Sequence, residues 1–359
     1  MATSIGLRTL QRGDEGGGIL SVFAPALGKI AWTYVFLFAF NAGAWLAAFA
    51  AFRSHPVLLG TALLAYTFGL RHAVDADHIV AIDSVTRKLM HDGSRPVTVG
   101  LYFSLGHSTV VVLLTVAIAV AANAVRDCVP LLRVGGGVAG TAISALFLLA
   151  IATVNAGVLF DVLRAHGRAH RGQAHDDNAL DPPIMQGGFL GRLFRPVLAM
   201  VDASWKMYPL GVVFGLGFDT ATEVALLGIA AIEAGNALPV ATIMVFPLLF
   251  AAGMSLLDTT DGILMLGAYG WAFVRPDRKL FYNTIVTPVS IFAALLVGGI
   301  EALNLLGNRL GFNGGIWSAV DAVNGNLGTL GCAVVGLFFA SWIVSALIHR
   351  SRAWPADAW

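Results

Sequence analysis

Residues 71–78 read RHAVDADH, and this short stretch decides the fold. The neighbouring residues, 56–70 and 79–82, are almost wholly apolar. Two histidines, two aspartates and an arginine therefore interrupt what otherwise has the composition of a membrane-spanning helix. Ionisable side chains at that depth cost roughly 2.5–3.5 kcal/mol each on insertion scales and usually line the path of an ion or substrate. The stretch predicts a polar site inside a membrane.

The composition of the whole chain supports a membrane location. Of the 359 residues, 57% are hydrophobic and 12% are charged, whereas soluble domains carry about 25% charged residues. The mean hydropathy is +0.78. The net charge of +1 gives no reason to expect a nucleic-acid partner, and Cys128 and Cys332 match neither a zinc-binding nor a redox spacing. We expect an integral membrane protein surrounded by the lipid bilayer.

Hydrophobic segments long enough to span a bilayer recur along the chain and predict an all-α fold with eight transmembrane helices. They cover about residues 29–51, 56–85, 97–124, 131–163, 207–233, 238–274, 280–306 and 327–349. Residues 1–28 and 350–359 are expected to be tails and residues 164–206 a loop. The membrane portion then divides into residues 29–163, with helices 1–4, and residues 207–349, with helices 5–8.

Basic residues indicate which side of the membrane each connection faces. Most Lys and Arg residues fall in the two tails, in the 164–206 loop and in the other connections on that side. The opposite connections hold only Arg53, Arg126, Arg133 and Arg309. Because positively charged loops stay in the cytoplasm, we expect both tails and the long loop to be cytoplasmic. The protein is expected in the cytoplasmic (inner) membrane.

The second predicted helix carries a polar face. His72, Asp75 and His78 follow one another at spacings of three residues, which places them on one side of a helix. Arg71 lies one turn before Asp75 and is placed to pair with it. In a regular helix Asp77 points away from Asp75 by roughly 160°. Either Asp77 serves a different partner or the helix is distorted at this point.

Other predicted helices carry polar groups at a similar depth, counted at about 1.5 Å of rise per residue. We expect these groups to converge near the midplane of the membrane. The candidate metal ligands are His72, Asp75, Asp77 and His78 in the second helix, His107 in the third, Asp219 and Glu223 in the fifth and Asp258 in the sixth. Asn41, Arg71, Ser255 and Asp261 are supporting residues, and Asn41 suits helix packing better than metal ligation.

The charge of this set points to a cation. Six carboxylates and one arginine in a low-dielectric interior require protonation, water or a bound cation. Imidazole and carboxylate ligands without a thiolate cluster suit a borderline divalent ion such as Ni²⁺, Co²⁺ or Zn²⁺. A network that only braces the helices does not explain five ionisable residues among eight. The carboxylates of the fifth and sixth helices remain open to that bracing interpretation.

A weak internal repeat accompanies the site. Phe-Gly-Leu precedes the charged residues of the second helix at 68–70 and those of the fifth at 214–216. Gly-His-Ser at 106–108 matches Gly-Met-Ser at 253–255. The two helix pairs cross the membrane in opposite directions under the orientation above. We expect an inverted repeat of helices 2–3 against helices 5–6, with the site between its halves.

Four stretches combine into one signature: RHAVDADHI (71–79), LGHSTVV (105–111), LGFDTATE (216–223) and GMSLLDTTDG (253–262). They resemble the motifs of the NiCoT family of nickel/cobalt permeases, whose helix 2 core HX4DH falls on His72, Asp77 and His78. The resemblance implies that these three residues bind the metal. It also implies uptake of Ni²⁺ or Co²⁺ as the transported substrate, without a prosthetic group, by a single polypeptide that requires no ATPase subunit.

Two classes of membrane enzyme fit the sequence less well. An intramembrane metalloprotease would need histidines at i and i+4 with a glutamate base, whereas His72 and His78 are six residues apart. A membrane di-metal oxidase would need more histidines in its helices. We therefore do not expect an enzyme. An efflux protein of the same fold would use the same ligand chemistry, so the ligands leave the direction of transport open.

Overall fold

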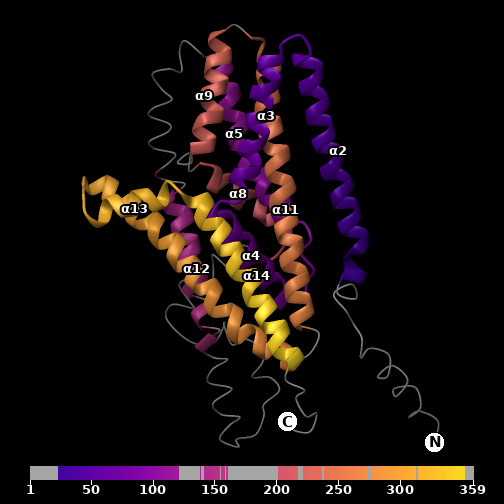
Figure 1. Cartoon of the computed structure of the whole chain (residues 1–359), viewed down its shortest axis with the longest axis vertical. Coiled ribbons are helices and arrows are strands. Elements are labelled where there is room, and N and C mark those ends of the chain that lie inside the picture. Colours follow the sequence, from indigo (N-terminus) through magenta and orange to yellow (C-terminus); the bar gives the residue numbers. More distant parts are fainter. Residues whose placement is uncertain are drawn as a thin grey trace, which may run out of the picture.

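The structure is a computed structural model, and it describes residues 23–120, 138, 141–153, 155–157, 159–160, 201–216, 221–236, 238–273, 276–312 and 314–351. Within these residues every regular element is helical (Figure 1). The long helices are α2 (Leu27–Phe52), α3 (Pro56–His72), α4 (Ala76–His91), α5 (Val99–Val120), α9 (Ala221–Gly235), α11 (Val245–Phe273), α12 (Pro276–Leu310) and α14 (Leu327–Ser351). The short elements are η1 (Ala24–Ala26), η4 (Ser204–Lys206), α8 (Met207–Gly215), α10 (Val240–Ile243) and α13 (Ile316–Asn324).

Several of these helices have the length and composition of membrane spans. Among the described residues, four apolar helices are long enough, and the bent pair of α3 and α4 raises the number to five. Shorter apolar helices cover Thr141–Gly157, Ala225–Gly235 and Leu327–Phe338. The chain therefore has the make-up of a multi-pass helical membrane protein.

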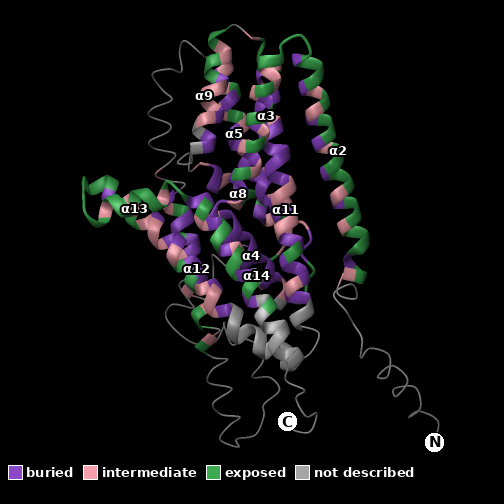
Figure 2. Ribbon diagram, viewed as in Figure 1, coloured by how far each residue is buried: buried purple, intermediate pink, exposed green. Residues whose placement is uncertain are grey.

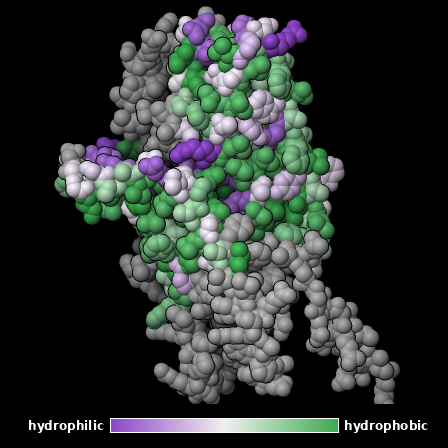
Figure 3. Space-filling model, viewed as in Figure 1, coloured by the Kyte–Doolittle hydropathy of each residue, from purple (hydrophilic) through white to green (hydrophobic). Residues whose placement is uncertain are grey.

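Exposure of apolar side chains fits a lipid-facing surface. Val57 at the start of α3 is 82% exposed and Trp32 in α2 is 76% exposed. Buried residues concentrate at the centre of the bundle, around α3, α5 and α11, whereas α2 and α13 are largely exposed (Figure 2). Hydrophobic residues cover most of the described part of the face shown in Figure 3. Large exposed apolar patches of this kind mark contact with a membrane or a partner.

The continuous helix expected over residues 56–85 is wrong, because the chain breaks it in two. α3 ends at His72, α4 begins at Ala76, and the two are bent by 51°. Asp75 is extended, with φ −66° and ψ 143°, and its amide donates to the His72 carbonyl at 2.9 Å. Aspartate is a favoured residue at this N-cap position. The distortion considered for Asp77 is therefore present.

The expected fifth helix is described in two parts. α8 ends at Gly215 and α9 covers Ala221–Gly235, while residues 217–220 lie outside the described part of the chain. The expected sixth helix starts with the short α10 before α11, and α13 was not expected at all. The first, third, seventh and eighth expected helices correspond to α2, α5, α12 and α14 within a few residues, as far as they are described.

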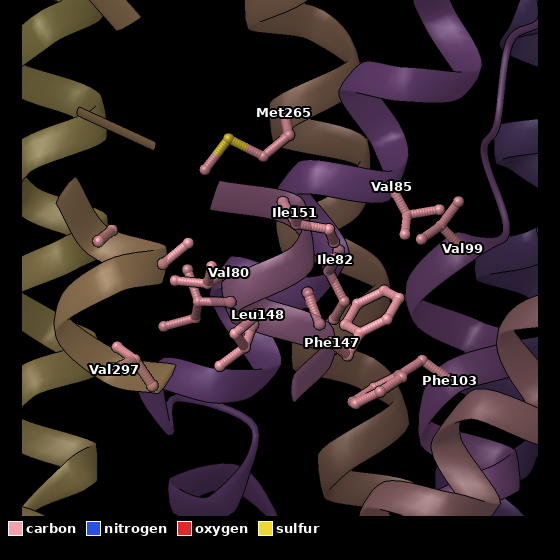
Figure 4. Close-up of a cluster of buried hydrophobic side chains, with 14 of the residues drawn as sticks. Val80, Ile82, Val85, Val99, Phe103, Phe147, Leu148, Ile151, Met265 and Val297 are labelled. Carbon is pink, nitrogen blue, oxygen red and sulfur yellow. The ribbon is translucent and has the colours of Figure 1, made fainter. Parts of the chain in front are cut away.

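α4 and α5 pack together with the neighbouring helices through a cluster of buried apolar side chains. Val80 and Ile82 of α4, Phe103 of α5, Leu148 and Val297 belong to this cluster (Figure 4). Burial of each such side chain contributes about 1.5–3 kcal/mol in a soluble protein, but between lipid and protein the gain comes mainly from close packing. The cluster holds the start of α4 in place, and that start carries part of the polar site.

Candidate metal centre

Three imidazoles meet at the break between α3 and α4. His72 is the last residue of α3, His78 lies in the first turn of α4, and His107 lies in the middle of α5. One ligand nitrogen from each lies within 4.8 Å of the other two. Nε2 of His72 is 2.9 Å from Nε2 of His107. All three side chains are buried.

The break is what brings His72 and His78 together. In a straight helix, residues six apart are separated by about 9 Å along the axis and by about 120° around it. In the bent pair the two ring centres are only 4.6 Å apart. The ring of His107 is 4.7 Å from that of His72 and 4.9 Å from that of His78. The expected convergence of the second and third helices is confirmed.

Two carboxylates lie within hydrogen-bond distance of the Nδ1 atoms of His72 and His78. Nδ1 of His72 is 3.0 Å from Oδ2 of Asp75, and Nδ1 of His78 is 3.3 Å from Oδ2 of Asp258. A carboxylate can only accept, so each Nδ1 carries the proton when the carboxylate is ionised. The Nε2 atoms are then available as acceptors, and Nε2 of His78 has no hydrogen-bond partner among the described residues. Metal-binding histidines are commonly oriented by such carboxylates.

Glu223, in the first turn of α9, reaches the same point from a fourth helix. Its Oε1 is 2.8 Å from Nε2 of His107 and 3.9 Å from Nε2 of His72. Beside it, Oγ1 of Thr222 is 3.4 Å from Nδ1 of His72. A carboxylate oxygen and two imidazole nitrogens therefore face one small volume.

The spacing of these atoms suits one ion. Two nitrogens that each lie about 2.1 Å from an ion are about 3.0 Å apart when the angle at the ion is 90°. The His72 and His107 nitrogens are 2.9 Å apart. Imidazole and carboxylate donors without sulfur suit Ni²⁺, Co²⁺ or Zn²⁺.

The supporting residues take different places. Asn41 is a packing residue, as expected, because its Nδ2 donates to the Ala252 carbonyl at 3.2 Å and its Oδ1 accepts from the Tyr66 hydroxyl at 3.0 Å. Arg71 lies 3.9 Å from Oδ1 of Asp75, so the expected pairing is present at the limit of an ion pair. Ser255 accepts a hydrogen bond from Ser104 at 3.1 Å and so joins α11 to α5.

Three of the candidate residues are less closely tied to the imidazoles. Oδ1 of Asp77 and Oδ2 of Asp261 are buried and accept no hydrogen bond from any described residue. Asp77 lies one residue before His78, and Asp261 lies one turn beyond Asp258. Asp219 lies outside the described residues.

A second buried polar cluster was not found from the sequence. Asp83 accepts hydrogen bonds from the hydroxyls of Tyr269 and Ser290, and Nη1 of Arg87 donates to Thr287 at 3.2 Å. Asp83 and Arg87 are both buried. They lie at the expected end of the second helix, where charged residues normally mark its emergence from the membrane. The spacing of Asp83 and Arg87, one turn apart on the same helix, was the sequence feature that could have indicated this cluster.

Buried imidazoles and carboxylates at the centre of an apolar helical bundle define a membrane protein of the ion-transporting class. The chain belongs to the NicO family, described as high-affinity nickel-transport proteins, whose family model matches residues 58–348. The expected family relationship is confirmed. The members compared below are named as transport proteins, so the chain is not grouped with membrane metalloenzymes.

Several relatives resemble the chain over most of its length. A high-affinity nickel transport protein from Cupriavidus necator is 55% identical, over 90% of this chain and 92% of the relative. A nickel transporter, NixA, from Staphylococcus aureus is 40% identical, over 83% and 87% respectively. A cobalt transport protein, NhlF, from Rhodococcus rhodochrous is 37% identical, over 82% and 84%. No solved structure matches the chain.

Proposed function

We propose that the protein is a secondary transporter that takes up Ni²⁺, Co²⁺ or both across the cytoplasmic membrane. One observation carries the proposal: three buried imidazoles converge within 4.8 Å in a member of a nickel-transport family. Relatives named for nickel and for cobalt support either ion as the substrate. The ion is cargo, and the proposal includes no prosthetic group.

The ligands in this proposal are His72, His78, His107 and Glu223. Their ring nitrogens and carboxylate oxygen face one another with short separations. Asp75 and Asp258 act instead on the outer nitrogens of His72 and His78, so we assign them an orienting role. This assignment differs from the expectation that both carboxylates bind the ion directly.

Asp77 and Asp219 also belong to the proposed site. The unpartnered Oδ1 of Asp77 is buried beside His78 and leaves an acceptor for an arriving ion. Asp219 rests on the motif alone. Arg71, Ser255 and Asp261 are proposed to balance charge and hold the surrounding helices.

We propose eight membrane spans. The bent pair α3–α4 counts as one span, α8 with α9 as a second, and α10 with α11 as a third. The helix over Thr141–Gly157 is one more. The remaining spans are α2, α5, α12 and α14. The start of α2 and the end of α14 lie at the same end of the bundle (Figure 1), which supports tails on one side. The distribution of basic residues favours the cytoplasm for that side and for the loop over residues 164–206.

An inverted repeat is supported by close backbone contacts between α5 and α8. A Cβ added to Gly106 of α5 would lie 2.0 Å from the carbonyl oxygen of Tyr208. In return, a Cβ added to Gly211 of α8 would lie 2.0 Å from the carbonyl oxygen of Phe103. Only glycine fits at either position, because both neighbours are backbone atoms.

The same reciprocal contact joins α3 and α11. A Cβ added to Gly69 would lie 2.1 Å from the carbonyl oxygen of Phe250, and one added to Gly253 would lie 2.8 Å from that of Tyr66. Tyr and Gly three residues apart meet Phe and Gly three residues apart in both interfaces. α3 is followed by the break before α4, and α8 ends at Gly215. Transporters built from inverted repeats bind substrate between the halves, at broken helices.

Uptake of a divalent ion requires no ATP under this proposal. With the cell interior negative, each positive charge gains about 2.3 kcal/mol per 100 mV. A doubly charged ion therefore gains about 4.6 kcal/mol at 100 mV. We propose a single polypeptide without an ATPase subunit, because this gain drives accumulation when the free metal inside is low.

The test is accumulation of trace labelled Ni²⁺ and Co²⁺ in cells that express the protein. We expect accumulation above that of vector cells, abolished by His72→Ala and preserved by His55→Ala, which alters an exposed histidine before α3. Accumulation below vector cells would identify efflux. No change with either ion, despite protein in the membrane, would reject transport of these ions.

A further inference from the structure

Two phenylalanine rings lie against the imidazole cluster. The ring of Phe103, in α5, is 4.8 Å from the ring of His78 and almost perpendicular to it, at 89°. The ring of Phe250, in α11, is 5.5 Å from the ring of His72. Both phenylalanines are completely buried. An aromatic ring therefore contacts each of the two histidines at the break, His72 of α3 and His78 of α4.

The two rings lie on opposite sides of the cluster along the bundle. α4 runs away from His78 and α5 runs back, so Phe103, one turn before His107, lies on the α4 side. The carbonyl of Phe250 packs on Gly69, three residues before His72, so Phe250 lies on the α3 side. α3 and α4 lead from the break towards opposite ends of the bundle (Figure 1).

The two phenylalanines occupy matching positions in the sequence. Phe103 begins the pattern Phe-x-x-Gly-x-Ser at residues 103–108, and Phe250 begins the same pattern at residues 250–255. Each presents its carbonyl to a glycine of a neighbouring helix, Gly211 for Phe103 and Gly69 for Phe250. They are thus equivalent residues of the two repeat halves.

Each ring continues into a layer of further apolar side chains. Phe103 is 5.3 Å from Phe214, whose ring is 5.9 Å from Phe147, and Phe103 and Phe147 lie in the apolar cluster of Figure 4. Phe250 belongs to the cluster that contains the stacked pair Phe52 and Phe246. A hydrated divalent ion does not cross such layers without displacing them.

We propose that Phe103 and Phe250 are the two barriers of an alternating-access cycle, one closing the imidazole cluster on the α4 side and the other on the α3 side. The proposal rests on the transport function above, and the orientation proposed there makes Phe103 the inner barrier and Phe250 the outer one. One ring moves aside while the other stays, so the ion is never open to both sides.

The two barriers predict opposite kinetic changes. Phe103→Ala weakens the inner barrier and shifts the protein towards its inward-open form. A tenfold loss of the outward-facing population raises the apparent KM for external Ni²⁺ about tenfold. Phe250→Ala favours the outward-open form, so the KM stays unchanged or falls while the maximal rate falls several-fold. Initial rates of Ni²⁺ uptake by intact cells measure both constants from the outer face.

Binding of Ni²⁺ to the purified full-length protein separates gating from damage to the site. We expect the affinity in detergent to stay within a small factor for both variants, because neither ring supplies a ligand. Leu37→Ala is the control, since Leu37 in α2 is equally buried but belongs to neither of the two apolar clusters. If an alanine variant does not reach the membrane, Phe103→Leu and Phe250→Leu carry the same test with smaller shifts.

Three results of these measurements distinguish the barriers from the alternatives. Opposite changes at the two positions, absent in the Leu37 control, support the barriers. Equal changes of KM and maximal rate at both positions, or a parallel loss of Ni²⁺ affinity, would overturn them. Failure of the unsubstituted protein to bind or accumulate Ni²⁺ would instead overturn the transport function itself.

Discussion

Replacement of Asp75 by asparagine tests whether this carboxylate acts through His72. Its Oδ2 lies 3.0 Å from Nδ1 of His72, and both side chains are 1% exposed. A hydrogen bond to a charged group contributes about 1.5–3 kcal/mol, or roughly 10- to 150-fold in an equilibrium constant. Loss of such a partner of a metal ligand typically weakens metal affinity by about 10- to 100-fold. Asparagine still accepts the Nδ1 proton, so we expect about tenfold weaker Ni²⁺ binding.

Equilibrium binding of Ni²⁺ to the purified protein measures this effect, and a double-mutant cycle gives its origin. If Asp75 acts only by orienting His72, Asp75→Asn should change the residual affinity of the His72→Ala variant by less than about twofold. A tenfold loss in that background would refute the orienting role and return Asp75 to the ligands. Asp92→Asn is the matched control, since Asp92 pairs with Lys88 at the exposed end of α4.

Three further outcomes are expected. Ni²⁺ binding should weaken as the pH is lowered from about 8 to 5, because protons compete with the ion for the imidazole nitrogens; an isotherm that does not change over this range would argue against histidine ligation. Gly69→Ala should destabilise the protein by about 1–3 kcal/mol or more in thermal unfolding, because its Cβ meets the Phe250 carbonyl, whereas Gly43→Ala, with open space around it, should not. Tyr269→Phe removes one donor to Asp83 and should cost about 1–3 kcal/mol in the same assay; an unchanged melting temperature would contradict this.

The sequence was sufficient to find most of the histidines and carboxylates of the site. Ionisable residues inside apolar runs are conspicuous, and their depth along each helix follows from a fixed rise per residue. The meeting of His72 with His107 followed from that count. The specific pairing of His78 with Asp258 did not, because several carboxylates were expected at a similar depth and the count along a helix does not choose among them.

The sequence left a distortion of the second helix as one of two explanations for Asp77 and did not predict a complete break. Residues 73–75 contain neither proline nor glycine, so the N-cap preference of Asp75 was the local signal available. A tertiary contact accompanies the break: a Cβ added to Gly331 of α14 would lie 1.7 Å from the Val74 carbonyl oxygen, so only glycine fits there. The division of the carboxylates into ligands and orienting groups depends on that bend, and periodicity in a straight helix could not supply it.

The bend between α3 and α4 also couples binding of the proposed ion to the angle between the two helices. His72 is the last residue of α3 and His78 lies in the first turn of α4. In the proposed site, an ion bound by both residues forms a chelate ring that includes the break. A change in the angle between α3 and α4 would then strain that ring or release the ion from one of the two histidines. A ligand present at one hundred times its Kd stabilises the bound form by about 2.7 kcal/mol. In the proposed site, that free energy favours the angle between α3 and α4 at which both histidines bind, so the transported ion would stabilise one conformation of the protein.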